Sequence, residues 1–74
     1  MARYLILKSP ANEVILSMLN IPYETYDYGI VFDFELNREN LLTLARTIRL
    51  LGYAHSDEYA LRLAQSFFLN KLSE

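Results

Sequence analysis

The sequence predicts a small, single α+β domain over residues 1–74. A short apolar run near the start predicts a buried strand, and alternation from Tyr26 to Leu36 predicts a sheet with one dry face. Three further segments have apolar residues at helical spacing, and each follows a capping residue. We therefore expect the order β-α-β-α-α, with a two- or three-stranded sheet and the helices packed on one of its faces.

The first strand is predicted from Arg3 to Lys8, where four large apolar residues follow one another. Such a run is typical of a strand that is covered on both faces. Ser9 and Pro10 predict a helix start, with Ser9 as N-cap and Pro10 at the first helical position, where its missing N–H costs nothing. Because Pro22 disfavours helical geometry in the residue before it, this helix is expected to end near Asn20.

The middle segment carries an apolar residue at every even position from 26 to 36. This pattern predicts either one long strand or a hairpin with Asp27, Tyr28 and Gly29 as a three-residue loop. That loop would pair Glu24 with Phe32, which is a poor match. The sequence thus favours one long or bulged strand, with the hairpin as the alternative.

The last two predicted helices begin at Asn37 and Ser56, and Gly52 ends the first of them as its left-handed C-terminal residue. The final helix is expected to run from Ser56 to Leu72. Its apolar residues would cover an arc of roughly 220°, whereas a helix on a core needs about 100°. The excess apolar surface predicts a partner surface, most simply a second copy of the chain.

We therefore expect a homodimer formed through the C-terminal helix. Leu61, Phe68 and Leu72 are the predicted interface residues on that helix. Leu42 and Leu50 are the exposed apolar candidates on the preceding helix.

The amino-acid composition limits the classes of function that are possible. At 53% hydrophobic residues, with two glycines and two prolines, the chain is expected to be folded. The absence of cysteine excludes disulfides and thiol chemistry. No signal peptide or membrane span is recognisable, so a soluble cytoplasmic protein without a membrane partner is expected. A net charge of −2 makes nucleic acid an unlikely partner on charge alone.

No catalytic residue, metal site or cofactor is predicted, and we expect no enzyme. His55, the single histidine, could form a metal site with Asp57 and Glu58. Such a site needs three or four ligands that converge from different segments. The two carboxylates already suit the first turn of the last helix, where they complement its dipole. A metal-dependent hydrolase at His55 is therefore a minor alternative.

Two polar surfaces remain as candidates. Aromatic and acidic residues in the first half could recognise a basic protein: Tyr23, Asp27, Asp33 and Glu35. The competing interpretation is that Tyr26 and Tyr28 only extend the dry face of the sheet. Residues 1–36 carry two basic against five acidic side chains, which favours a basic partner.

The second polar surface is an arginine flank, formed by Arg38, Arg46 and Arg49 within an arc of about 80° on the Asn37-capped helix. It would suit a nucleic-acid-binding regulator. Asp57 and Glu58 argue against this because they stand where a recognition helix would meet DNA. The leading prediction is a non-enzymatic protein–protein interaction module of unidentified partner. It would act as an adaptor, inhibitor or regulatory subunit, as in small phage or plasmid proteins.

Overall fold

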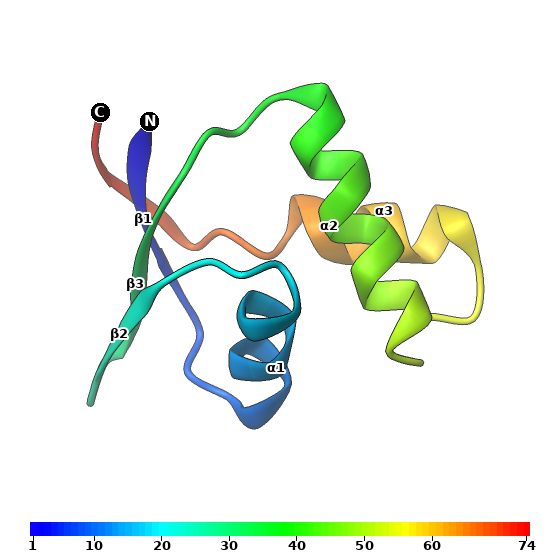
Figure 1. The fold of residues 1–74 in the computed structure, drawn as a ribbon, viewed down its shortest axis with the longest axis horizontal. Coiled ribbons are helices and arrows are strands. Elements are labelled where there is room, and N and C mark those ends of the chain that lie inside the picture. Colours follow the sequence, from blue (N-terminus) through cyan, green and yellow to red (C-terminus); the bar gives the residue numbers. More distant parts are fainter.

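The computed structural model describes residues 1–74 as an α+β domain, which confirms the predicted class. The sheet lies at one end and the three helices lie on one side of it (Figure 1). The strands are β1 (Ala2–Ile6), β2 (Tyr23–Tyr26), β3 (Gly29–Phe34) and β4 (Asn70–Ser73). The helices are α1 (Pro10–Met18), α2 (Arg38–Leu50) and α3 (Asp57–Gln65). The sheet is antiparallel with the order β2-β3-β1-β4, and thus has four strands where two or three were expected.

The helix starts lie at the predicted caps. The side-chain oxygens of Ser9, Asn37 and Ser56 each accept a hydrogen bond from a backbone N–H three residues further on, at 3.1, 2.8 and 3.1 Å. Gly52 adopts a φ of +87° after α2, as predicted. The next N–H, of Tyr53, donates to the carbonyl of Ile48 at 3.1 Å and closes the helix end. These predictions succeeded because capping depends on local chemistry.

The prediction of one long strand from Tyr26 to Leu36 is wrong. β2 and β3 form a hairpin with a two-residue loop, and Tyr26 pairs with Gly29. In the alternative hairpin prediction Gly29 lies in the loop, which shifts the pairing by one residue. Gly29 belongs to β3 because it passes close to β1: a Cβ atom there would lie 2.6 Å from the carbonyl oxygen of Ile6.

β1 is covered on one face only, which corrects the expectation of a doubly buried strand. Ala2, Tyr4 and Ile6 are buried toward the helices. On the other face Arg3 is exposed and Leu5 is only partly buried. Sequence alone could not distinguish these cases, because both faces of the strand carry leucine or isoleucine.

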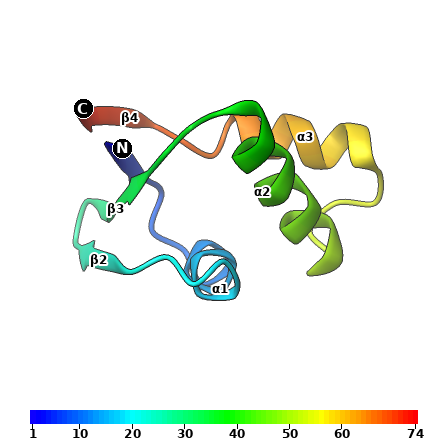
Figure 2. The ribbon, with the colours of Figure 1, turned by 45° about the horizontal axis from the view of Figure 1, so that its top comes forward.

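The prediction of a helix from Ser56 to Leu72 is also wrong, since α3 ends at Gln65 and the chain continues into β4 beside β1 (Figure 2). The two phenylalanines after α3 explain the ending. Phe67 lies 6.2 Å from the ring of Phe32, and Phe68 lies 4.8 Å from the ring of Tyr4. Both rings thus pack on aromatic side chains of β1 and β3. The chain that leaves the helix buries Phe67, packs Phe68 on the sheet and pairs β4 with the edge of β1.

The core lies between the covered face of the sheet and the helices. Its largest fully buried side chains come from β1, α1, β3 and α2, namely Ile6, Leu16, Ile30 and Leu44. No polar or charged side chain is buried. The core is therefore held by apolar packing, and the charged side chains lie outside it.

Candidate protein-interaction surfaces

The five residues predicted at a dimer interface lie in different parts of the fold. Leu42 and Leu61 line one groove between α2 and α3. Leu50 is 82% exposed at the end of α2. Phe68 is partly buried against the sheet aromatics, and Leu72 is exposed on β4. The excess apolar arc was an artefact of the overlong helix, so only the Leu42–Leu61 pair forms a shared surface.

The groove between α2 and α3 has a volume of about 520 Å³. Its floor is formed by Ala45 and Ala60, which are 6% and 1% exposed. Small side chains allow the two helices to approach closely, and the groove walls are then formed by Leu42 and Leu61. The two leucines thus form an apolar centre on the outside of the helical layer.

Opposite charges flank this apolar centre. Arg46 lines the groove from α2, and Asp57 and Glu58 line it from the first turn of α3. Arg49 forms an ion pair with Asp57, and Arg62 lies 3.6 Å from Glu58. Arg46 forms no ion pair within 4.0 Å. We call the surface formed by Leu42, Arg46, Asp57, Glu58 and Leu61 the α2–α3 face.

The predicted arginine flank is exposed on α2: Arg38, Arg46 and Arg49 all reach solvent. Arg49 is engaged by Asp57, however, and the acidic turn of α3 adjoins Arg46 in the groove. A phosphate group at this flank would meet carboxylates as well as guanidinium groups. This part of the surface therefore carries both signs of charge.

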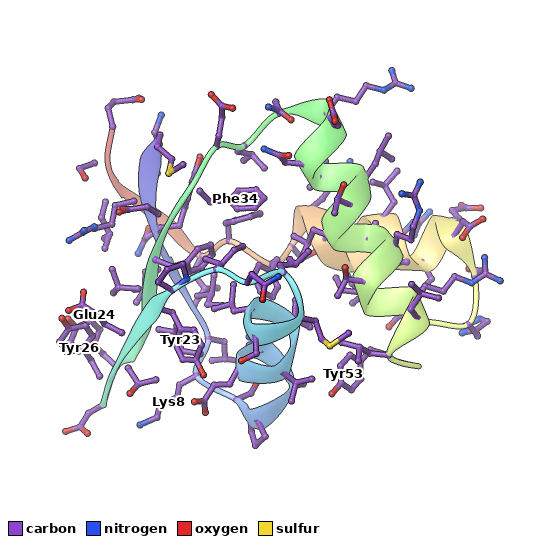
Figure 3. All side chains as sticks on the ribbon, viewed as in Figure 1. Lys8, Tyr23, Glu24, Tyr26, Phe34 and Tyr53 are labelled. Carbon is purple, nitrogen blue, oxygen red and sulfur yellow. The ribbon has the colours of Figure 1, made fainter.

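The predicted acidic and aromatic residues do not converge. Tyr23 faces α1, where its hydroxyl donates to Glu13 Oε1 at 3.3 Å (Figure 3). Asp27 lies in the hairpin loop at one end of β3, whereas Glu35 follows the other end. Asp33 lies on the opposite face of the sheet from Tyr23. These four residues therefore form no common surface.

The sheet face that no helix covers, the open sheet face, carries a different polar arrangement. Arg3 Nε donates to Asp33 Oδ1 at 3.0 Å across β1 and β3. This hydrogen bond lowers the pKa of Asp33 and raises the pKa of Arg3. The rings of Tyr26 and Tyr28 stack at 5.1 Å with 13° between their planes. The expectation that both tyrosines extend the dry face is wrong, because the two-residue loop reverses which β2 residues face the core.

Glu24 lies beside Tyr26 on the side of the sheet away from the helices (Figure 3). Its carboxylate is the main cause of a raised pKa of Tyr26, with burial of the hydroxyl second. Sequence reasoning missed this pairing of Glu24 with the stacked tyrosines. The signal that could have revealed it is Gly29 as the first residue of β3, which places Glu24 and Tyr26 on the same face as Val31.

Two other cavities have simpler linings. One, of about 550 Å³, lies beside the end of β3 and is bordered by Asp33, Glu35 and Asn40. The other, of about 340 Å³, is lined mainly by apolar residues of α1, α2 and the segment after α3. His55 is exposed and its ring lies 5.6 Å from that of Tyr59. No three His, Asp or Glu side chains anywhere in the chain are placed to hold a metal ion.

No family model, curated protein or solved structure matches the chain. No helix has both the length and the apolar character needed to cross a membrane.

Proposed function

We propose that the protein is a non-enzymatic protein–protein interaction module that forms a homodimer through the α2–α3 face. The observation that supports this is the position of Leu42 and Leu61 between a basic side chain on α2 and an acidic turn on α3. A face with an apolar centre and opposite charges on its two sides is complementary to a second copy of itself.

A two-fold axis along the groove brings α2 of one copy opposite α3 of the other. In this arrangement Leu42 meets Leu61 of the second copy, and the reverse contact forms by symmetry. Arg46 then lies opposite the acidic turn with Glu58, which supplies the ion pair that Arg46 lacks within one chain. Each contact is made twice, so the interface gains both its apolar centre and its charge pairs in duplicate.

The size of the molecule sets the extent of this interface. Only 17 of 74 residues are buried, so the core is small and association would add to its stability. A typical stable interface covers about 800 Å² per partner. That is about a sixth of the 4992 Å² surface of this chain. The interface therefore extends from the groove over the outer sides of α2 and α3, where Leu50 is exposed.

Light scattering on a sizing column tests this proposal. We expect a mass near twice 8.7 kDa, and a Leu61→Asp variant that is monomeric because it places a carboxylate in the apolar centre. Leu72→Asp on β4 is the matched control, since it adds the same charge away from the helices and should leave the dimer intact. A wild-type monomer, or a dimer that persists in Leu61→Asp, would refute the interface.

A charge exchange tests the polar contacts separately. Arg46→Glu should weaken the dimer because two like charges then face each other, and adding Glu58→Arg should restore it. Restoration in the double variant is the result that a general loss of stability cannot produce. Failure of the double variant to recover would show that these two residues do not face each other across the interface.

A nucleic-acid-binding regulator is the second candidate, because neither Arg38 nor Arg46 forms an ion pair within the chain. Gel shifts with mixed DNA and RNA at about 50 and 200 mM salt distinguish the two candidates, since phosphate contacts weaken steeply with salt. We expect no shift at either concentration. A salt-sensitive shift that Arg46→Glu abolishes would favour the regulator.

A further inference from the structure

The edge strand β2 presents backbone hydrogen-bonding groups that no part of the chain uses. The N–H of Leu69 donates to the carbonyl of Leu5 at 2.9 Å. The backbone N–H and C=O groups of the odd residues of β1 therefore point toward β4, and those of the even residues point toward β3. This alternation continues through the pairings of β1 with β3 and of β3 with β2, so the backbone groups of Glu24 and Tyr26 bond to β3. The backbone groups of Tyr23 and Thr25 therefore point away from the sheet, and neither residue has a turn or loop hydrogen bond.

Negative charges predominate around this edge, although Arg3 on β1 lies near enough to Glu24 to interact with it electrostatically. Between Lys8 and Arg38 the chain contains no basic residue, yet this stretch supplies α1, β2 and β3. Glu24 is exposed on β2, and Asp27 is exposed in the loop that follows it. Neither forms an ion pair within the chain. The only basic side chain bonded to this part of the sheet is Arg3, which is paired with Asp33.

An aromatic platform adjoins the same edge. The stacked rings of Tyr26 and Tyr28 are 39% and 67% exposed on the open sheet face. Tyrosine ring faces attract guanidinium and ammonium groups, and the nearby carboxylate of Glu24 adds to that attraction. Backbone groups, carboxylates and aromatic rings thus lie together along one strand and its loop.

We propose that the β2 edge binds an extended basic segment of a partner protein, which adds to the sheet as a fifth strand. The outward backbone groups of Tyr23 and Thr25 bond to the main chain of that segment. Its side chains alternate between the two faces of the sheet. Basic residues at every second position therefore lie on the open sheet face against Glu24 and the tyrosine pair.

The opposite edge of the sheet does not offer the same combination. β4 carries Lys71, and its side chain is already bonded to Glu74. The aromatic pair beside β4, Tyr4 with Phe68, lies on the covered face and not on the open sheet face. The pairing of β4 with β1 is also interrupted by a register shift between Arg3 and Tyr4. An irregular edge strand is a poor template for a further strand. The basic segment is therefore assigned to β2.

A peptide titration followed by backbone amide NMR shifts tests this assignment. The probe is a peptide of roughly eight residues with alternating arginine and threonine, acetylated and amidated at its ends. We expect shifts centred on β2 and its loop. Two control peptides should fail: one with glutamate in place of arginine, and one with N-methyl groups on alternate amides, which blocks strand pairing but keeps the charge.

Thr25 offers a sharp test of the backbone contact. Thr25→Pro removes the outward N–H, and proline is tolerated on an edge strand when its nitrogen faces solvent, so the fold should remain intact. We expect peptide affinity to fall by about tenfold or more. Thr25→Val is the matched control, because it keeps the N–H and the β-branched shape and should bind as the wild type does.

Glu24→Lys is a second variant that leaves the backbone unchanged, and it should also abolish binding because it reverses the charge of the edge. The proposal is overturned if the peptide does not bind at low salt, or if Thr25→Pro binds it as tightly as Thr25→Val. It is also overturned if Thr25→Pro changes the mass of the protein, since the edge would then pair with a second copy. These residues are not part of the α2–α3 face, so either proposal can fail alone.

Discussion

The two faces of the sheet differ in what they contribute. On the covered face, β3 places Ile30, Phe32 and Phe34 in the core, where they are between 0 and 9% exposed. On the open sheet face the same strand carries Val31 and Asp33. Val31 is 6% exposed but lies outside the main core cluster, and Asp33 is exposed and bonded to Arg3. One strand therefore serves both a hydrophobic core and a polar surface.

This difference indicates which face of the sheet tolerates substitutions without loss of the fold. Substitutions on the covered face remove packing that no other part of a small core can replace. Those on the open sheet face change charge and ring contacts whose effects water moderates. The proposed binding residues Glu24 and Tyr26 lie on the second face, so their side chains can vary at little cost to folding.

Truncation of two neighbouring side chains on β3 should give the largest difference in stability between the two sheet faces. Phe32→Ala removes a ring that is 3% exposed among other aromatic rings, and should destabilise the protein by about 3–5 kcal/mol. Val31→Ala removes a smaller side chain from the other face and should cost about 1–2 kcal/mol. Urea unfolding followed by circular dichroism, at one fixed protein concentration, measures both. Equal losses would show that the open sheet face is as important to folding as the core.

Low pH should destabilise the protein slightly through Asp33, which lies on the open sheet face. The hydrogen bond from Arg3 holds the pKa of Asp33 below its ordinary value of 3.8 in the folded protein. The contribution of ionised Asp33 to the free energy of unfolding is therefore present above a pH of 3.8, and it is lost as the pH falls through the lowered pKa of the folded protein. Asp33→Asn should be less stable than the wild type at pH 7, and the difference in stability should narrow as the pH falls below 3.8. Because the pair is exposed, the effect should be far smaller than that of Phe32→Ala. A gap that persists in acid would mean that the variant acts through packing.

The smallest expected effect is on tyrosine ionisation. The carboxylate of Glu24 raises the pKa of Tyr26 above its ordinary value of 10.0. The contribution of protonated Tyr26 to the free energy of unfolding is complete below a pH of 10.0, and it is lost as the pH rises through the raised pKa. Glu24→Gln should therefore shift the latest part of the tyrosine absorbance titration to lower pH. Glu35→Gln, beyond the other end of β3, should leave the curve unchanged. Identical shifts in both variants would indicate an effect of net charge alone.

Sequence reasoning was accurate where one short segment contains the whole cause. The caps at Ser9, Asn37 and Ser56 and the left-handed Gly52 were predicted because each depends on a few neighbouring residues. It failed at the hairpin, where the position of Gly29 depends on the distance to Ile6 in another strand. Of the candidate sites, Leu42 and Leu61 were brought together, while the other predicted surfaces were dispersed.

The sequence by itself determined the α+β class, the helix starts, the absence of thiol chemistry and the acidic stretch between Lys8 and Arg38. Tertiary structure alone decided that α3 stops at Gln65, that β4 joins the sheet and that Tyr26 faces solvent. Helical periodicity continues through Phe67 and Phe68, so nothing local ends the helix. The end is set by the aromatic rings of β1 and β3, because packing two adjacent phenylalanines against them outweighs one more helical turn.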